Sequence, residues 1–116
     1  MKRLFLVIVA GVALLCAAPA VAATKKVQVG DNYFLDSSLR VKKGTTVVWR
    51  WPGAEAAGDV HDVTLKKGPK GVKKFASEAA SSDYSFRRKL KVPGQYRIVC
   101  TLHEEMKMTI RVRRPS

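Results

Sequence analysis

Residues 92–112 read VPGQYRIVCTLHEEMKMTIRV and contain two alternating patterns joined by a short polar loop. The residues on the apolar face of these patterns are Tyr96, Ile98 and Cys100, then Met108, Ile110 and Val112. Period-two alternation after a Pro-Gly turn signal is typical of half-buried strands. The stretch therefore predicts two adjacent strands, and the loop between them, residues 100–106, carries a thiol, an imidazole and a thioether.

The same alternation recurs along the chain at short intervals. It appears at residues 27–29, 39–41, 47–51, 61–65 and 84–86. These patterns predict an all-β fold of seven or eight short antiparallel strands in a sandwich or barrel. The exception is 66–82, where we expect a loop with an irregular strand at 72–75 and a short helical turn at 76–80.

The first 23 residues have the composition of a secretory signal peptide. Lys2 and Arg3 precede an apolar run at 4–15, and small residues of the A-x-A kind lead to Ala22 and Ala23. The apolar run is short for a membrane span, so we expect cleavage near Ala22 or Ala23 rather than a transmembrane helix. Residues 24–116 would then form a single domain in the periplasm or outside the cell.

The chain is strongly basic. It contains 22 Lys and Arg against 9 Asp and Glu, a net charge of +13, and removal of Lys2 and Arg3 leaves +11. Such a charge attracts acidic partners and, more weakly, anionic surfaces. Nucleic acid is not an expected partner, because export and the absence of a recognised binding motif argue against it.

Loss of the signal peptide would remove one of the two cysteines, Cys16, and leave Cys100 alone. A single cysteine cannot form an internal disulfide, and a free thiol is a liability in an oxidising compartment. Two explanations remain open for its presence: ligation of a metal, or simple burial as a small apolar residue.

The full chain has two histidines, His61 and His103. With Cys100 and a nearby methionine they supply two imidazoles, a thiolate and a thioether, a donor set that suits copper better than zinc. Cys100 and His103 could instead be a nucleophile and its base, although no third orienting group is evident. Taken one at a time, each of these residues is more often structural.

Three stretches together resemble the cupredoxins, the small type 1 copper proteins. They are VQVGDNYFLDSSLRVKKGTTVVWRW at 27–51, HDVTL at 61–65 and the opening stretch at 92–112. The resemblance, strongest to amicyanin and plastocyanin, implies a Greek-key β-sandwich that binds one copper ion. It implies His61, Cys100 and His103 as equatorial ligands and Met106 as the axial ligand, with Met108 as the alternative.

The function implied by this likeness is the shuttling of single electrons between redox protein partners, here with a preference for acidic ones. The alternative is a copper carrier or storage protein of the same fold. An enzyme is not expected, because related oxidases and reductases need additional copper centres and this chain has no spare histidine. We expect a monomer without catalytic residues.

Three positions depart from the common pattern of the family. Asp62 stands where relatives often carry Asn, whose amide ties the two ligand segments together, and an ionised carboxylate cannot donate a hydrogen bond. Leu102 replaces a frequent proline. Glu104 and Glu105 make the surroundings of His103 more polar than usual, and the alternative is that they select a basic partner surface against the overall positive charge of the chain.

Overall fold

The structure is a computed structural model that describes residue 11 and residues 23–114. The expected signal peptide, residues 1–23, therefore lies outside the described residues except at positions 11 and 23. The strands are β1 (Thr24–Gly30), β2 (Tyr33–Phe34), β3 (Ser38–Lys42), β4 (Thr45–Arg50), β5 (Thr64–Lys67), β6 (Ser85–Leu90), β7 (Gly94–Val99) and β8 (Lys107–Arg113), with a short 3₁₀ helix, η1 (Ala54–Ala56), between β4 and β5. None of the helices in the described part of the chain is long and apolar enough to cross a membrane.

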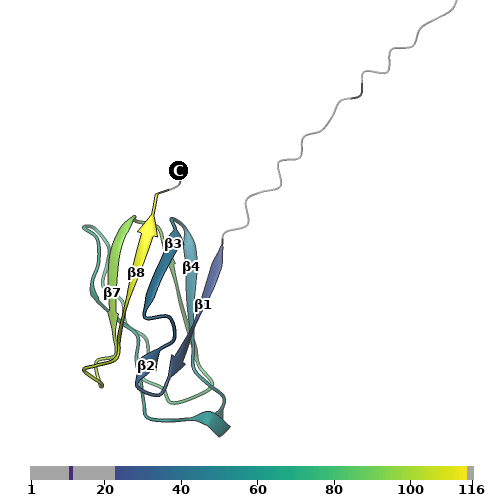
Figure 1. The fold of residues 1–116 in the computed structure, drawn as a ribbon, viewed down its shortest axis with the longest axis vertical. Coiled ribbons are helices and arrows are strands. Elements are labelled where there is room, and N and C mark those ends of the chain that lie inside the picture. The colour runs from purple at the N-terminus through teal and green to yellow at the C-terminus, as the bar shows by residue number, and fades with distance from the viewer. Residues whose placement is uncertain (1–10, 12–22, 115–116) are drawn as a thin grey trace, which may run out of the picture.

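The eight strands form two facing four-stranded sheets (Figure 1). One sheet has the order β2-β1-β4-β6 and the other the order β3-β8-β7-β5. The predicted all-β sandwich is confirmed. The chain crosses from one sheet to the other between β2 and β3 and again between β3 and β4, so β1 and β4 are neighbours although β3 lies between them in sequence.

The prediction that all strands are antiparallel was wrong for two pairings. Strand β1 runs parallel to β4, and β3 runs parallel to β8. Both parallel pairs follow from changes of sheet, because a chain that leaves a sheet and returns after an even number of reversals runs in its original direction. Period-two alternation reports which face a residue occupies and carries no information on strand direction.

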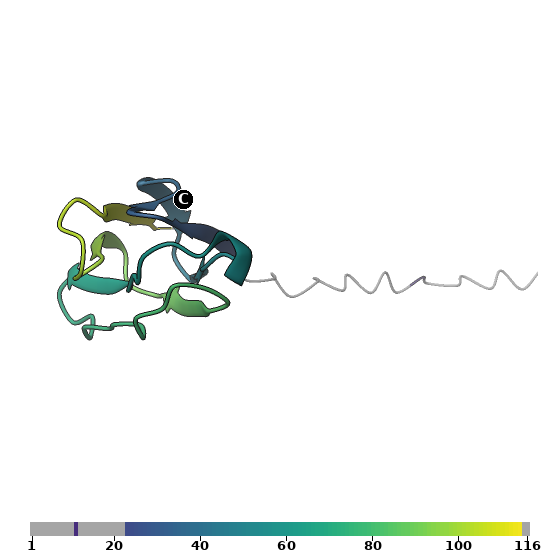
Figure 2. The same ribbon diagram turned by 90° about the horizontal axis from the view of Figure 1, so that it is seen from below.

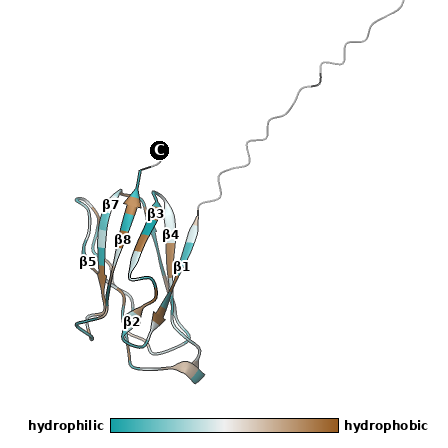
Figure 3. Cartoon of the chain, viewed as in Figure 1, coloured by the Kyte–Doolittle hydropathy of each residue, from teal (hydrophilic) through white to brown (hydrophobic). Residues whose placement is uncertain are grey.

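The core lies between the sheets and is built from the inward-facing residues of each strand. Exposed and buried positions alternate strictly in β3, and β8 follows the same alternation with one outward residue, Thr109, half-buried. Figure 3 shows apolar segments in the same strands. The largest side chains that are almost fully buried include Trp49, Tyr96, Ile98, Met106, Met108 and Ile110.

Two turns at the end where β1 begins depend on glycine. Gly44, between β3 and β4, has φ of +89°, and Gly94, where β7 begins, has φ of +135°. Both values lie in a region that side-chain-bearing residues rarely adopt. A Cβ at Gly94 would also lie 2.7 Å from the Pro69 ring. These turns leave the loops at the opposite end to build the functional site.

The segment between β5 and β6 differs from its prediction. It forms neither the irregular strand expected at 72–75 nor the helical turn expected at 76–80. Instead it runs beside the β5 segment and makes two isolated bridges, Thr64 with Ala76 and His61 with Ala80. The backbone N–H and C=O groups of this segment are hydrogen-bonded to the neighbouring segment, so they do not need the hydrogen bonds of a local helical turn.

Candidate metal centre

The structure brings together three of the four predicted ligands at the end of the sandwich seen from below in Figure 2. His61 precedes β5, Cys100 directly follows β7, and His103 lies in the loop between β7 and β8. His61 and Cys100 are buried, and they lie in segments about 40 residues apart in the sequence. Residues 61 and 80 hold each other by two backbone hydrogen bonds, His61 N to Ala80 O at 2.9 Å and Ala80 N to His61 O at 3.0 Å.

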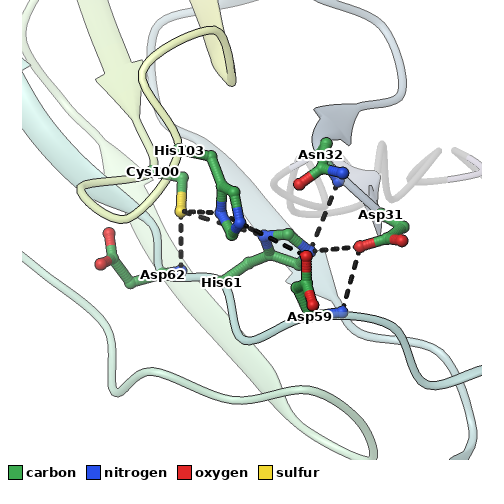
Figure 4. Close-up of polar contacts among 7 residues, drawn as sticks. All are labelled: Asp31, Asn32, Asp59, His61, Asp62, Cys100 and His103. Atoms are coloured by element: carbon green, nitrogen blue, oxygen red, sulfur yellow. Dashed lines mark hydrogen bonds and ion pairs between the residues drawn. The ribbon is translucent and has the colours of Figure 1, made fainter.

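The donor atoms of these three side chains converge (Figure 4). The two Nδ1 atoms are 3.1 Å apart. The Sγ of Cys100 lies 3.6 Å from Nδ1 of His103 and 4.0 Å from Nδ1 of His61. Two imidazole nitrogens and a sulfur this close can hold one metal ion between them, and this donor set suits copper.

A carboxylate faces the far nitrogen of each imidazole. Oδ1 of Asp31 is 3.1 Å from Nε2 of His61, and Oδ2 of Asp59 is 3.6 Å from Nε2 of His103. Carboxylates only accept, so the contact with Asp31 favours the His61 tautomer with hydrogen on Nε2 and a free lone pair on Nδ1, whereas Asp59 is too far from His103 for a hydrogen bond. The backbone N–H of Asn32 also approaches Nε2 of His61, at 3.4 Å, but a donor there needs the opposite tautomer. The shorter contact with the charged acceptor is the stronger one.

Asp31 reaches His61 from the two-residue turn between β1 and β2. Asn32, the other turn residue, has φ of +69°, which closes the turn tightly. Oδ1 of Asp31 also accepts the backbone N–H of Asp59 at 3.1 Å. That hydrogen bond, and secondarily the one with His61, lowers the pKa of Asp31 below its usual value. Asp31 therefore stays ionised beside the imidazole at neutral pH.

Asp62 links the segment of His61 to the segment of Cys100. Its backbone N–H donates to the Cys100 sulfur at 3.5 Å. Its buried carboxylate accepts from Thr64 Oγ1 at 2.8 Å, from the backbone N–H of Thr101 at 3.1 Å and from the Thr101 hydroxyl. The missing amide of the usual Asn is thus replaced by a carboxylate whose donors come from Thr101 and Thr64.

The loop at 100–106 closes on itself. The backbone N–H of Cys100 donates to the carbonyl of Met106 at 2.9 Å, and the N–H of Met106 donates to the carbonyl of His103 at 3.0 Å. Met106 is 1% exposed at the entrance to β8. The sulfur of Met108 is engaged elsewhere, because it accepts the indole N–H of Trp49 at 3.4 Å within the core.

The two histidines differ in their access to solvent. The side chain of His61 is 3% exposed, whereas that of His103 is 27% exposed. Leu102, next to His103, is 55% exposed, and Glu104 and Glu105 are exposed as well. The edge of His103 is therefore where the centre meets the surface.

Reasoning from the sequence missed three residues of this site: Asp31, Asp59 and Thr101. Asp31 is 30 positions from His61, and its contact depends on β1 and the β4–β5 connection ending side by side. No spacing rule points to such a pair. One signal was available for Thr101. Asp62 stands where relatives often carry Asn, and a buried carboxylate there needs hydrogen-bond donors, which Thr101, directly after Cys100, can supply.

Comparison with known proteins agrees with this geometry. The sequence pattern of the copper binding proteins of the plastocyanin/azurin family matches residues 21–113. Amicyanin-alpha from Methylorubrum extorquens is 31% identical over 88 residues, which cover 76% of this chain and 71% of the relative.

Solved structures share the fold. A point mutant of amicyanin in its reduced Cu(I) form at pH 4 superimposes with a TM-score of 0.66 at 22% identity, covering 83% of this chain and 88% of that one. A copper-containing nitrite reductase from Thermus scotoductus gives a TM-score of 0.62 at 27% identity, and the match covers 83% of this chain but 23% of the reductase. The sequence match and the cluster of copper-type donors show that this chain belongs to the plastocyanin/azurin family of copper-binding proteins.

Proposed function

We propose that residues 24–116 form an exported electron carrier that holds one copper ion, after removal of a signal peptide at 1–23. The observation that carries the proposal is the convergence of His61, Cys100 and His103 at the loop end of a cupredoxin sandwich. The similarity to amicyanin-alpha, over most of both chains, supports a carrier. Copper bound by these donors would supply a one-electron Cu(I)/Cu(II) couple.

We propose His61, Cys100 and His103 as the equatorial ligands and Met106 as the axial one. Met106 is buried beside the loop that it closes by backbone hydrogen bonds to Cys100 and His103. The alternative, Met108, has its sulfur occupied by the Trp49 indole in the core. Both observations support Met106.

The surrounding residues would hold the donors nearly still while the charge of the metal changes. Asp31 orients the His61 imidazole, Asp59 places a negative charge near His103, and the Asp62 N–H donates toward the thiolate. Interactions of this kind fix ligand orientation and tune the metal. Electrons would pass through the exposed edge of His103, since the ring of His61 is covered.

The proposed partners are redox proteins, and the carrier acts as a monomer in the periplasm or outside the cell. It is not expected to be an enzyme: both histidines are used by one centre, so none remains for a second copper site. The net charge alone favours acidic partners. The charge is unevenly distributed, however, and the carboxylates near His103 favour a basic partner surface at the metal end.

The experiment is optical and electrochemical. Protein loaded with Cu(II) should show an intense thiolate-to-copper absorption that ascorbate bleaches, and a reversible wave in voltammetry. Cys100→Ser should lose the absorption. A colourless copper complex without a reversible wave would reject the electron carrier and favour a copper carrier or storage protein.

The axial assignment has its own test. Met106→Leu should raise the reduction potential, because a weak axial donor is lost. Met108→Leu should leave the potential unchanged and cost about 1 kcal/mol of stability, since it repacks the core. If the potential followed Met108 instead, that residue would be the ligand.

A further inference from the structure

Acidic and basic residues are completely separated along the mature chain. All nine Asp and Glu lie in four segments, 30–37, 51–64, 76–84 and 100–106, and these segments contain no Lys or Arg. Every Lys and Arg after residue 23 lies in the intervening segments, which contain no acid. A net charge of +11 therefore describes the whole molecule and neither of its parts.

The four acidic segments are all at the metal end of the sandwich. Hydrogen bonds join them to one another: Asp59 N to Asp31 Oδ1, Asp83 N to Pro52 O, and Thr101 N to Asp62 Oδ1. In Figure 1 they occupy the lower end of the molecule, opposite the end at which β1 begins. Two basic strand residues directly adjoin these segments in the sequence: Arg50 precedes 51–64, and Lys107 follows 100–106.

Exposed apolar side chains gather at the same end. Of the large hydrophobic residues that are exposed in the described part of the chain, Tyr33, Leu35, Val60 and Leu102 lie in these segments, at 45–55% exposure. The fifth, Val92, lies in the turn between β6 and β7 at the far end. His103 is next to Leu102 and to the exposed Glu104, so apolar surface, a partly exposed ligand candidate and exposed carboxylates occur together.

We propose that the metal end is the docking surface for a redox protein that presents lysines or arginines around an apolar centre. This inference rests on the proposed electron transfer and names the chemistry of the partner. Apolar contact supplies close approach at the centre of an interface, and complementary charge around it sets orientation and association rate. Electrostatic interactions fall off over a screening length of about 8–10 Å at physiological salt, so the exposed carboxylates of this end should act on a docked partner more strongly than the basic residues nearer the opposite end. Lys66, Arg97 and Lys107, which line a pocket together with Glu105, offset part of this local negative charge.

This surface reverses what the net charge suggests. A protein of charge +11 should repel a basic partner on average, yet its end carries the opposite sign. The separated charges turn the metal end toward a cationic surface and the basic strands away from it. Orientation by such a field raises association rates about 10-fold or more at low salt.

The test uses two redox proteins as probes: cytochrome c, whose haem edge is ringed by lysines, and cytochrome b5, which is acidic. Stopped-flow rates are measured with the copper-loaded protein at low and high ionic strength. The wild type should react faster with cytochrome c, and salt should slow that reaction. Faster reaction with cytochrome b5, slowed by salt, would place docking on the basic strands and overturn the proposal.

Two variants separate local charge from net charge. Glu104→Gln/Glu105→Gln removes two carboxylates beside His103, and Thr24→Lys/Gln95→Lys adds the same +2 to exposed residues at the far end. The first should slow the reaction with cytochrome c about fivefold at low salt, within the range of electrostatic steering, and the second less than twofold. Equal slowing in both variants, or no slowing in the first, would refute docking at the metal end.

A binding measurement needs no electron transfer and separates this inference from the proposed function. Titration with cytochrome c should shift backbone amide NMR resonances in 30–37, 51–64 and 100–106. Shifts confined to β6 and residues 65–75 would overturn the docking surface. Loss of the thiolate-to-copper absorption with these shifts intact would instead reject the electron carrier and leave the surface in place.

Discussion

Thr101→Val tests whether the carboxylate of Asp62 holds the two ligand segments together. The substitution keeps the shape and the backbone N–H of residue 101 but removes the hydroxyl that donates to Asp62. The carboxylate keeps its bonds from the Thr101 N–H and from Thr64 Oγ1. The Asp62 side chain is largely buried, at 7% exposure, so the carboxylate loses one of its hydrogen-bond donors in a place with little access to water.

The size of the effect follows from the charge of the acceptor. A hydrogen bond to an ionised group contributes about 1.5–3 kcal/mol, and the low end applies because Thr101 is exposed and water can replace part of the interaction. For a domain of this size, 1 kcal/mol changes Tm by about 4–8 °C. The metal-free protein should therefore melt roughly 6–12 °C lower.

Thermal unfolding of the metal-free protein, followed by circular dichroism, measures this change. Thr46→Val, a half-buried threonine in β4, is the control and should change Tm by much less. In an Asp62→Asn background the effect of Thr101→Val should shrink, because a neutral acceptor contributes about 1 kcal/mol. If Thr101→Val lowered Tm no more than Thr46→Val did, or lowered it equally with Asp62 and with Asn at position 62, the Asp62 carboxylate would not be what joins the two ligand segments.

Three further outcomes can be measured on purified protein. The Tyr96 hydroxyl donates to the Val92 carbonyl at 2.7 Å, so Tyr96→Phe should cost about 1 kcal/mol of stability at neutral pH. Burial raises the pKa of Tyr96 above 10.0. The urea midpoint of the wild type should therefore fall toward that of the variant as pH rises through the folded pKa. Asp31→Asn should weaken copper binding about 10-fold in competition with a chelator because His61 loses a charged acceptor, whereas Asp36→Asn should not. Copper at 100 times its Kd should stabilise the protein by about 2.7 kcal/mol in thermal melts, and Cys100→Ala should lose most of this gain.

Alternation and residue types predicted the strands and the three converging donors. Tyr96, Ile98 and Ile110 are buried as the pattern requires, and His61 meets Cys100 and His103 although their segments are far apart in sequence. These features are readable because each depends on a local period or on a rare residue type. The ligand roles, and Met106 as the axial donor, remain predictions.

The remaining features depend on which segments the topology brings together. The parallel pairing of β1 with β4 follows from chain crossings, and the bridge of Ala80 to His61 replaced an expected helical turn. Asp31 reaches His61 only because β1 ends beside the β4–β5 connection. The separation of acidic and basic segments was visible in the sequence, but its meaning required the fold to place all four acidic segments at one end.

That separation gives the molecule a large electric dipole directed along the strands. On a carboxylate-coated electrode the protein should adsorb through its basic strands and hold the metal end in solution, far from the conductor. On an amine-coated electrode it should turn over and present the edge of His103 to the surface. The charge of the coating alone would then decide whether the adsorbed protein exchanges electrons rapidly with the electrode or is bound without measurable electron exchange.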